Sequence, residues 1–175
     1  MPRVFEYISK PSRAQRFSKE ISFPVIVEPL LSGIPLQLHK QKDIVMIYNR
    51  EGEHEESYND LARSISRLDA PKRCILQLVA NISQQRIYII DCLLFEDSAD
   101  QEQPWGARRQ IIRNQISFLP GMVIPPSKVI NDMRGLIDFL SSKASAIIKE
   151  YNGTRIWVFD SQQHDLNDLK ESFDG

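Results

Sequence analysis

Three arginines stand close together in a stretch whose pattern predicts a helix. Arg108, Arg109 and Arg113 follow a proline that is typical of a first helical turn. A helix presents Arg109 and Arg113 on one face, while Arg108 points elsewhere. Guanidinium groups neutralise phosphate charge, so the stretch is a candidate nucleic-acid contact. The alternative is a solvated outer face whose arginines pair with Glu96 or Asp97.

Three other reactive side chains lie within apolar runs. Asp91 interrupts a run of hydrophobic residues, which predicts a strand-end carboxylate satisfied by the backbone or by an arginine. Cys74 and Cys92 indicate buried reduced thiols, with a disulfide as the alternative. No C-x-x-C pair or histidine cluster in the sequence supports a zinc site.

The bulk composition is that of an ordinary globular protein. The 175 residues carry a formal net charge of −1, so binding to nucleic acid or to an anionic membrane requires a local patch. No apolar run approaches the ~20 residues of a membrane span, and the N-terminus lacks a signal-peptide core. We expect an intracellular protein, cytoplasmic or nuclear, that does not associate with membranes. The predicted organisation is a lead-in over residues 1–20, one domain over 21–161 and an acidic tail over 162–175.

Strands are the first elements needed to position these side chains. Residues 23–27 and 34–38 are apolar runs hinged at residues 32–33, and Leu36 and Leu38 alternate with polar residues. Taken alone, these two runs predict a hairpin or a bend in a mixed sheet. Further strands are predicted at residues 43–50, 73–80, 86–95, 146–149 and 155–159. The long apolar runs at 73–80 and 86–95 are typical of central strands covered on both faces.

Helices are predicted outside these strands. One begins near Ser57 as its N-cap, one opens at Pro104, and the longest covers residues 127–144 with Ser127 as its N-cap. The lead-in is expected on the surface with one short helix. The Asn-Gly pair at residues 152–153 predicts a hairpin turn between the last two strands.

The stretch from residue 28 to residue 35 resembles the nucleotide-attachment motif of ATP-dependent DNA ligases and mRNA-capping enzymes, Glu-x-Lys-x-Asp-Gly-x-Arg. Glu28 and Gly33 match the motif. The family's lysine forms a phosphoramidate with the nucleotide, and that position here is Leu30. The Asp and Arg positions are Ser32 and Pro35. The frame of the motif is present without its reacting groups.

Later segments continue this resemblance in order. Arg50 lies in a segment similar to the Ser-Arg-x-Gly turn, where the family's arginine meets the substrate. Gln77 stands at the position of a metal- and ribose-associated glutamate, and Ile90 at that of an aromatic residue that stacks on the purine. Asp91 matches an aspartate of the same motif, and residues 103–112 resemble the Leu-Pro-Tyr-x-x-Arg-Arg helix.

The last motifs are partly retained. Lys149 survives from Glu-Gly-x-Val-x-Lys, whose glutamate is here Ala144. Trp157 echoes the final Trp-x-Lys-x-Lys strand, and both of that strand's lysines are missing. We expect the chain to lack the oligonucleotide-binding barrel that closes the site in these enzymes.

The resemblance implies an α+β fold, the ligase-like nucleotidyltransferase (adenylation-domain) fold, with bent antiparallel-rich mixed sheets and outer helices. It implies a vestigial nucleotide cleft without a catalytic lysine, a metal ion or a cofactor. The cleft positions are Glu28, Leu30, Ser32, Gly33, Pro35, Gln77, Ile90, Ala144 and Lys149. We expect Leu30 and Ile90 to be largely buried there. Candidate nucleic-acid contacts are Arg50, Lys149, Arg108, Arg109 and Arg113.

Three functions fit these patterns. The first is a catalytically inactive module that binds DNA or RNA ends, a nucleotide or a protein. The second is an active ligase-type nucleotidyltransferase with a relocated lysine, for which Lys40, Lys42 and Lys149 are candidates. The third is a structural interaction subunit. The joint loss of reacting groups from a retained scaffold favours the first.

Overall fold

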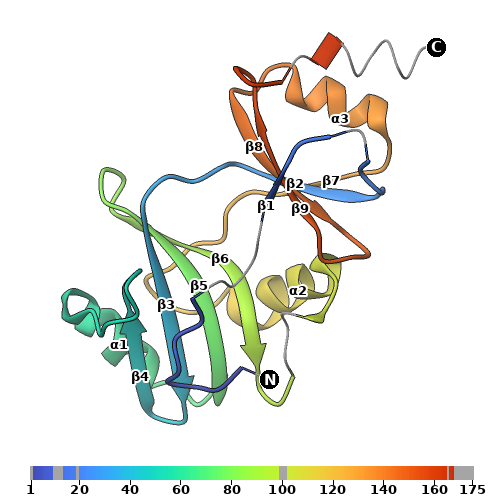
Figure 1. Ribbon diagram of the computed structural model, residues 1–175. Coiled ribbons are helices and arrows are strands. Elements are labelled where there is room, and N and C mark those ends of the chain that lie inside the picture. The colour runs from blue at the N-terminus through green and yellow to red at the C-terminus, as the bar shows by residue number, and fades with distance from the viewer. Residues whose placement is uncertain (1, 10–13, 19, 99–101, 165, 168–175) are drawn as a thin grey trace. The chain divides into compact units, whose positions relative to one another are not determined.

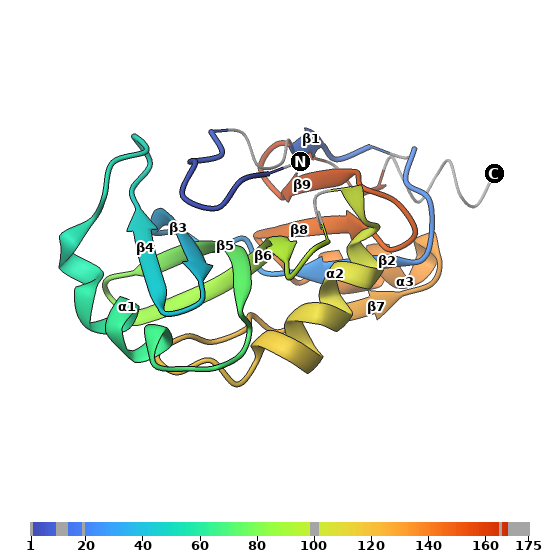
Figure 2. The same cartoon turned by 90° about the horizontal axis from the view of Figure 1, so that it is seen from below.

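The computed structural model describes residues 2–9, 14–18, 20–98, 102–164 and 166–167 (Figures 1 and 2). The chain divides into two compact units, each with its own sheet. The first unit comprises Met1–Pro11, Leu31–Gln103 and Arg108–Pro125. The second unit comprises Ser12–Leu30, Pro104–Ala107 and Pro126–Gly175.

A four-stranded antiparallel sheet forms the first unit, with the strand order β4-β3-β5-β6 (Figure 1). Its strands are β3 (Ile34–Gln41), β4 (Ile44–Tyr48), β5 (Arg73–Asn81) and β6 (Arg86–Phe95). Its helical elements are η1 (Glu56–Tyr58), α1 (Asn59–Ser66), the end of α2 (Trp105–Ile111) and the π-helical turn η3 (Ile112–Ile116).

Alternate residues of two neighbouring strands build the core of this unit. Leu36 and Leu38 of β3 lie opposite Leu78 and Leu76 of β5, and all four are at most 1% exposed. Ile65 of α1 packs into the same cluster, as do residues of η3. A strand places alternate side chains on opposite faces, so this cluster defines one face of the sheet.

A five-stranded sheet forms the second unit, with the order β1-β9-β8-β2-β7 (Figure 2). The elements are β1 (Ala14–Arg16), β2 (Val25–Glu28), β7 (Lys128–Ile130), α3 (Met133–Leu140), β8 (Ser145–Glu150) and β9 (Ile156–Asp160). β1 runs parallel to β9, and the other neighbouring pairs are antiparallel.

β2 contributes side chains to both faces of this sheet. Val25 and Val27 pack with Leu136 of α3 in one cluster, which we call the α3 face. Ile26 packs with Trp105, from the start of α2, in a second cluster, which we call the Trp105 face. The strand is therefore covered on both sides.

The predicted α+β fold class is confirmed, with antiparallel-rich sheets and separate helices. β4, β5, β6, β8 and β9 match five of the predicted strands closely. The Asn-Gly pair lies in the connection between β8 and β9, as predicted. The tail prediction over residues 162–175 falls largely outside the described residues.

Two predictions about strand placement are wrong. The runs at residues 23–27 and 34–38 do not form one hairpin, because β2 and β3 belong to different sheets. β6 is an edge strand of its sheet, although its apolar sequence predicts a central one. Residues 87–89 of β6 are flanked by a bridge and hydrogen bonds to Val123, which explains an edge strand with buried side chains.

The helix predicted over residues 127–144 is also wrong. Its first part is β7, which pairs with β2, and α3 begins only after Asp132. Asp132 is the N-cap, and its carboxylate accepts a 2.7 Å hydrogen bond from the backbone N–H of Gly135. Ser57 likewise does not cap its helix; Glu55 caps η1 instead.

The N-terminal segment is more ordered than the predicted surface lead-in. Residues 14–16 form a strand rather than a helix, and β1 pairs in parallel with β9. Val4 and Ile8 pack against Ile75 and Leu94 of the first unit. Phe17, which follows β1, is buried in the core of the second unit.

Gly33 should not tolerate a side chain. Its φ of 155° and its closeness to β5 leave no space: an added Cβ would lie 2.4 Å from the carbonyl oxygen of Ala80. We expect Gly33→Ala to lower the free energy of unfolding by about 2 kcal/mol or more, measured by urea denaturation. The exposed neighbour Ser32 supplies the control, because Ser32→Ala should cost less than about 0.5 kcal/mol. Equal losses in the two variants would contradict the close packing.

Candidate functional site

The predicted cleft residues are distributed over both units. Glu28, Leu30, Ala144 and Lys149 belong to the second unit, and the remaining five belong to the first. The contacts within each unit show which of these residues have side chains bound by other protein groups.

Glu28 and Lys149 form a buried ion pair in the second unit. The β2–β8 register places Glu28 opposite Ile147, two residues from Lys149. Lys149 Nζ lies 3.0 Å from Glu28 Oε1 and 4.3 Å from the centroid of the Trp105 ring. The side chains are only 7% and 14% exposed. Lys149 is therefore held by protein groups and does not present a solvated charge.

Two other cleft positions of this unit face solvent. Leu30 is 44% exposed, so its expected burial is wrong. Ala144 is exposed as well. Ile90 of the first unit, which was expected to be buried, is half-buried.

Gln77 lies within a buried polar network in the first unit. β3 and β5 place Gln37 directly opposite Gln77, and Gln37 Nε2 donates a 3.0 Å hydrogen bond to Gln77 Oε1. Gln37 also donates to the carbonyl of Ile8 and accepts from its N–H, at 3.1 and 2.9 Å. The Gln37 side chain thus binds both backbone groups of Ile8, the N–H and the carbonyl, as the backbone of a neighbouring strand would.

His39 extends this network along β3. The N–H of Phe5 donates to His39 Nδ1 at 2.8 Å, so the proton resides on Nε2, which lies 2.8 Å from Gln37 Oε1. Tyr48 OH donates to the carbonyl of Phe5 at 3.1 Å. Burial lowers the pKa of His39 from 6.5 to about 4, so its imidazole is neutral at pH 7.

The N-terminal segment therefore covers the second face of the first sheet. Residues 4–8 supply both the hydrogen bonds and the apolar contacts, and Gln37 and His39 are fully buried. The alternation of β3 indicates a polar, solvated face, and sequence analysis gave no sign of this cover. The feature that marks it is an apolar Val-Phe pair at residues 4–5 within a polar segment.

Asp91 has the partner that its sequence context predicts. Arg108 Nη1 lies 3.1 Å from Asp91 Oδ2, and the N–H of Cys92 donates to Asp91 Oδ1. Both charged side chains are at most 5% exposed. Arg108 is therefore a core residue and does not belong to an exposed patch.

The other candidate arginines lie nearer the surface. Arg50 and Arg113 are exposed, and Arg109 is half-buried. Arg50 follows β4 in a turn that Asn49 organises by accepting hydrogen bonds from the N–H groups of Glu51 and Glu53. The change from α2 to the π-helical η3 alters the four-residue spacing on which the pairing of Arg109 with Arg113 rested.

Lys40 is unsuited to the role of a relocated nucleophile. Its side chain is fully buried on β3, and its Nζ donates a 2.5 Å hydrogen bond to the carbonyl of Lys42. Lys42 itself is exposed at a turn with a φ of 55°. Of the three candidate lysines, two are thus committed to partners inside the protein.

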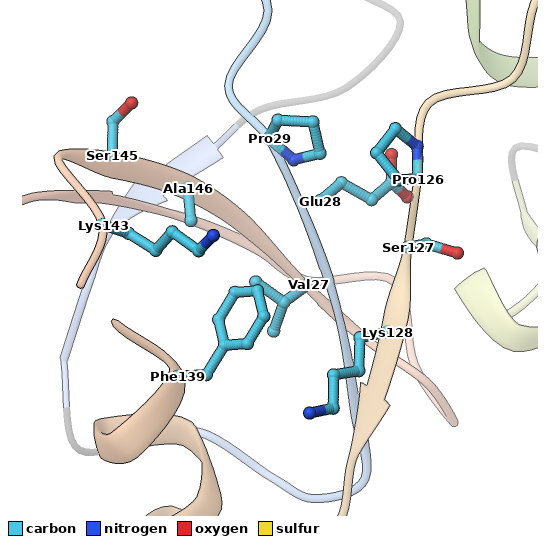
Figure 3. Close-up of a pocket in the computed structure, with 10 residues that line it drawn as sticks. All are labelled: Val27, Glu28, Pro29, Pro126, Ser127, Lys128, Phe139, Lys143, Ser145 and Ala146. Carbon is cyan, nitrogen blue, oxygen red and sulfur yellow. The ribbon is translucent and has the colours of Figure 1, made fainter. Parts of the chain in front are cut away.

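A pocket of about 330 Å³ opens on the α3 face of the second unit (Figure 3). Val27, Ala146 and Phe139 supply apolar lining, and Lys128 and Lys143 flank the Phe139 ring. The two Nζ atoms lie 5.6 and 5.0 Å from the ring centroid. Sequence analysis missed this pocket because it placed residues 127–144 in one helix.

Cys74 and Cys92 are free and buried, which confirms the prediction of reduced thiols. Burial raises the pKa of Cys74 to about 12. Within the described residues, no three His, Cys, Asp or Glu side chains gather into a group that could hold a metal ion. No described helix is both long and apolar enough to cross a membrane.

No protein-family model matches the sequence, and no curated protein matches it significantly. Solved structures match it in fold. The ligase domain of M. tuberculosis LigD gives a TM-score of 0.63 at 13% identity, over 85% of this chain and 57% of that chain. A mycobacterial DNA ligase D complexed with ATP and MES gives 0.62 at 11% identity, over 85% and 58%. A Lig E DNA ligase gives 0.57 at 10% identity, over 85% and 67%.

The chain therefore has the fold of DNA ligase nucleotidyltransferase domains. The likeness indicated by the sequence motifs holds at the level of the fold. The chain spans less than three fifths of the two mycobacterial ligase chains. Fold alone does not establish activity, which depends on the residues of the site.

Removing Lys149 should destabilise the second unit. We expect Lys149→Ala to lower the free energy of unfolding by about 3 kcal/mol, because the Glu28 carboxylate is left buried without its cation. The double variant Glu28→Gln/Lys149→Met should lose less stability than the sum of the losses in Glu28→Gln and Lys149→Met, since neither charge then remains. Lys128→Ala is the control and should change stability by less than about 0.5 kcal/mol. Urea titrations measure the free energy of unfolding of wild type and of these five variants. A loss in Lys149→Ala no larger than in the control would contradict a structural ion pair.

Stability should fall as the pH is lowered through the range set by His39. Its pKa is depressed from 6.5 to about 4 in the folded protein, so the unfolded chain binds more protons between these values. The contribution of His39 to the free energy of unfolding is complete above pH 6.5 and is lost by pH 4. Its total is about 3 kcal/mol.

Denaturation at several pH values tests this prediction. The difference between wild type and His39→Asn should shrink as the pH falls from 6.5 to 4. His54→Asn changes an exposed histidine and is the matched control. A wild-type-minus-His39→Asn difference that does not vary with pH would show that His39 is not held neutral.

Proposed function

We propose that this chain is a non-catalytic domain of the DNA ligase fold that binds nucleic-acid ends. The observation that carries the proposal is Leu30, which stands where the attachment motif of ligases has its nucleophilic lysine. A hydrocarbon side chain has no amine to attack the α-phosphate of a nucleotide.

The remaining lysines support this proposal. Lys149 is paired with Glu28 beneath the Trp105 ring, and the buried Lys40 donates to a backbone carbonyl. A lysine nucleophile must be accessible to the phosphate and deprotonated. Both ammonium groups are bound by protein partners inside the chain, which opposes access to a phosphate.

The environment of Gln77 gives independent support. In the ligase motif that this segment resembles, the position of Gln77 is held by a glutamate associated with the metal and the ribose. A neutral amide is a poor ligand for Mg²⁺. Gln77 accepts a hydrogen bond from Gln37, and Gln37 in turn binds Ile8. A nucleotide approaching this face of the sheet would have to displace residues 4–8.

Binding without catalysis is favoured by the exposed cations. Arg50 and Arg113 are exposed in the first unit, and Lys128 and Lys143 are exposed in the second. The net charge of −1 provides no general attraction, so phosphate contacts must come from such local groups. The ligase fold of the neighbours is consistent with DNA or RNA ends as the partner.

Labelled ATP tests the absence of catalysis. Neither wild type nor Leu30→Lys should retain a covalent nucleotide through denaturing electrophoresis, because in both Gln77 is bound by Gln37, which Ile8 holds in place. An adenylated wild-type protein would overturn the proposal and support a relocated lysine. Labelling of Leu30→Lys alone would show that the nucleotide face is open.

Nucleic-acid binding is tested by anisotropy with fluorescent nicked and single-stranded oligonucleotides. We expect binding that weakens with salt, with a log–log slope of roughly −0.7 to −0.9 for each phosphate contact. Arg50→Gln should flatten this slope, whereas Arg63→Gln, an exposed arginine paired with Asp60, should not. Absence of binding at low salt, with a co-purifying protein, would favour a structural interaction subunit.

A further inference from the structure

We propose that the pocket around Phe139 binds one unstacked nucleotide of a single-stranded nucleic acid. The inference rests on the proposed nucleic-acid function and names a site for it. The pocket lies entirely within the second unit and is lined by residues of β2, β7, α3 and β8 (Figure 3).

The lining of the pocket suits a base. Val27 and Ala146, which are at most 2% exposed, form an apolar wall, and the half-buried Phe139 ring lies beside it. Its volume of about 330 Å³ is at the lower end for ligand pockets and is large enough for a single ring system. Stacking of a base on an aromatic side chain is the usual interaction in sequence-tolerant single-strand binding.

The rim of the pocket suits a phosphate. Lys128 and Lys143 are exposed, and their ammonium groups lie 5.6 and 5.0 Å from the centroid of the same ring. No carboxylate among the described residues forms an ion pair with either lysine. The flexible lysine stems can stay beside the ring while the ammonium groups turn to a phosphate. Two free cations beside an aromatic ring match a base with its flanking phosphates.

The pocket opens on the opposite face of the sheet from Lys149. Val27 and Ala146 belong to the α3 face, whereas Ile26 and Ile147 belong to the Trp105 face. Glu28 touches the rim of the pocket, but its carboxylate is already paired with Lys149. The pocket therefore opens mainly on the α3 face, and Glu28 is the residue that its lining shares with the predicted cleft positions.

The geometry also favours a single strand over a duplex. A base inside a duplex is stacked on both sides and cannot enter a concave pocket unless it is unstacked, which costs free energy. A single-stranded end offers the same base without that cost. Acidic peptides would satisfy the lysines but would leave the ring without a planar partner.

Anisotropy with a fluorescent oligo(dT) strand tests the inference on the intact chain. Phe139→Leu should weaken binding about tenfold without changing the salt slope, because it removes stacking and no charge. Lys128→Gln/Lys143→Gln should lower the magnitude of the log–log salt slope by about 1.4, since each single-strand contact contributes about 0.7.

Matched controls lie in the first unit. Phe118→Leu changes a ring that is 56% exposed, and Lys72→Gln changes an exposed lysine; neither should alter binding as the pocket variants do. An abasic phosphodiester strand of equal length should bind wild type and Phe139→Leu equally. If Phe139→Leu fails to fold, the salt slope of the Lys128→Gln/Lys143→Gln variant tests the inference alone.

The outcomes separate this inference from the proposed function. Oligo(dT) binding that is unaffected by the Phe139 and lysine variants refutes the pocket and leaves nucleic-acid binding in place. Equal displacement of oligo(dT) by polyglutamate or by a blunt duplex also refutes it. Absence of oligonucleotide binding by wild type refutes the proposed function itself.

Discussion

The side-chain amide of Gln37 makes four hydrogen bonds: its nitrogen donates two and its oxygen accepts two. It binds both backbone groups of Ile8, donates to Gln77 and accepts from His39. A buried amide without partners is costly, so the polar face of the first sheet is stable only when residues 4–8 cover it. The same cover keeps His39 neutral and supplies apolar contacts to β5 and β6. This face is therefore organised around a peptide segment of the chain itself.

Charged residues at the positions that resemble ligase motifs form buried ion pairs in this protein. Glu28 pairs with Lys149, and Asp91 pairs with Arg108, in environments that are largely closed to water. Such pairs are expensive to break because each partner would leave a buried charge behind. They contribute to the integrity of each unit. The exposed cations lie elsewhere, and two of them flank the Phe139 ring.

The fold persists at 10–13% identity to the DNA ligase structures because it depends on hydrophobic patterning more than on particular side chains. Alternating residues such as Leu36 and Leu76 maintain the sheets. The positions that resemble the attachment motif are under a different constraint, since the side chain of Leu30 is exposed and a change there costs the core little. Scaffold and chemistry can therefore diverge independently in one chain.

The resemblance of the motifs implied the α+β class. Local patterns in the sequence determined most of the strands, the burial of both thiols and the need of Asp91 for a partner. These features depend on hydrophobic periodicity and on the cost of burying polar groups, and both can be recognised within a short stretch of sequence. Only the tertiary structure decided that Gln37 and His39 are buried, because alternation does not identify what covers the second face of a strand. It also decided that residues 128–130 form a strand, since pairing with β2 outweighs helical periodicity. The pocket joins side chains from four separate elements, and that proximity exists only after folding.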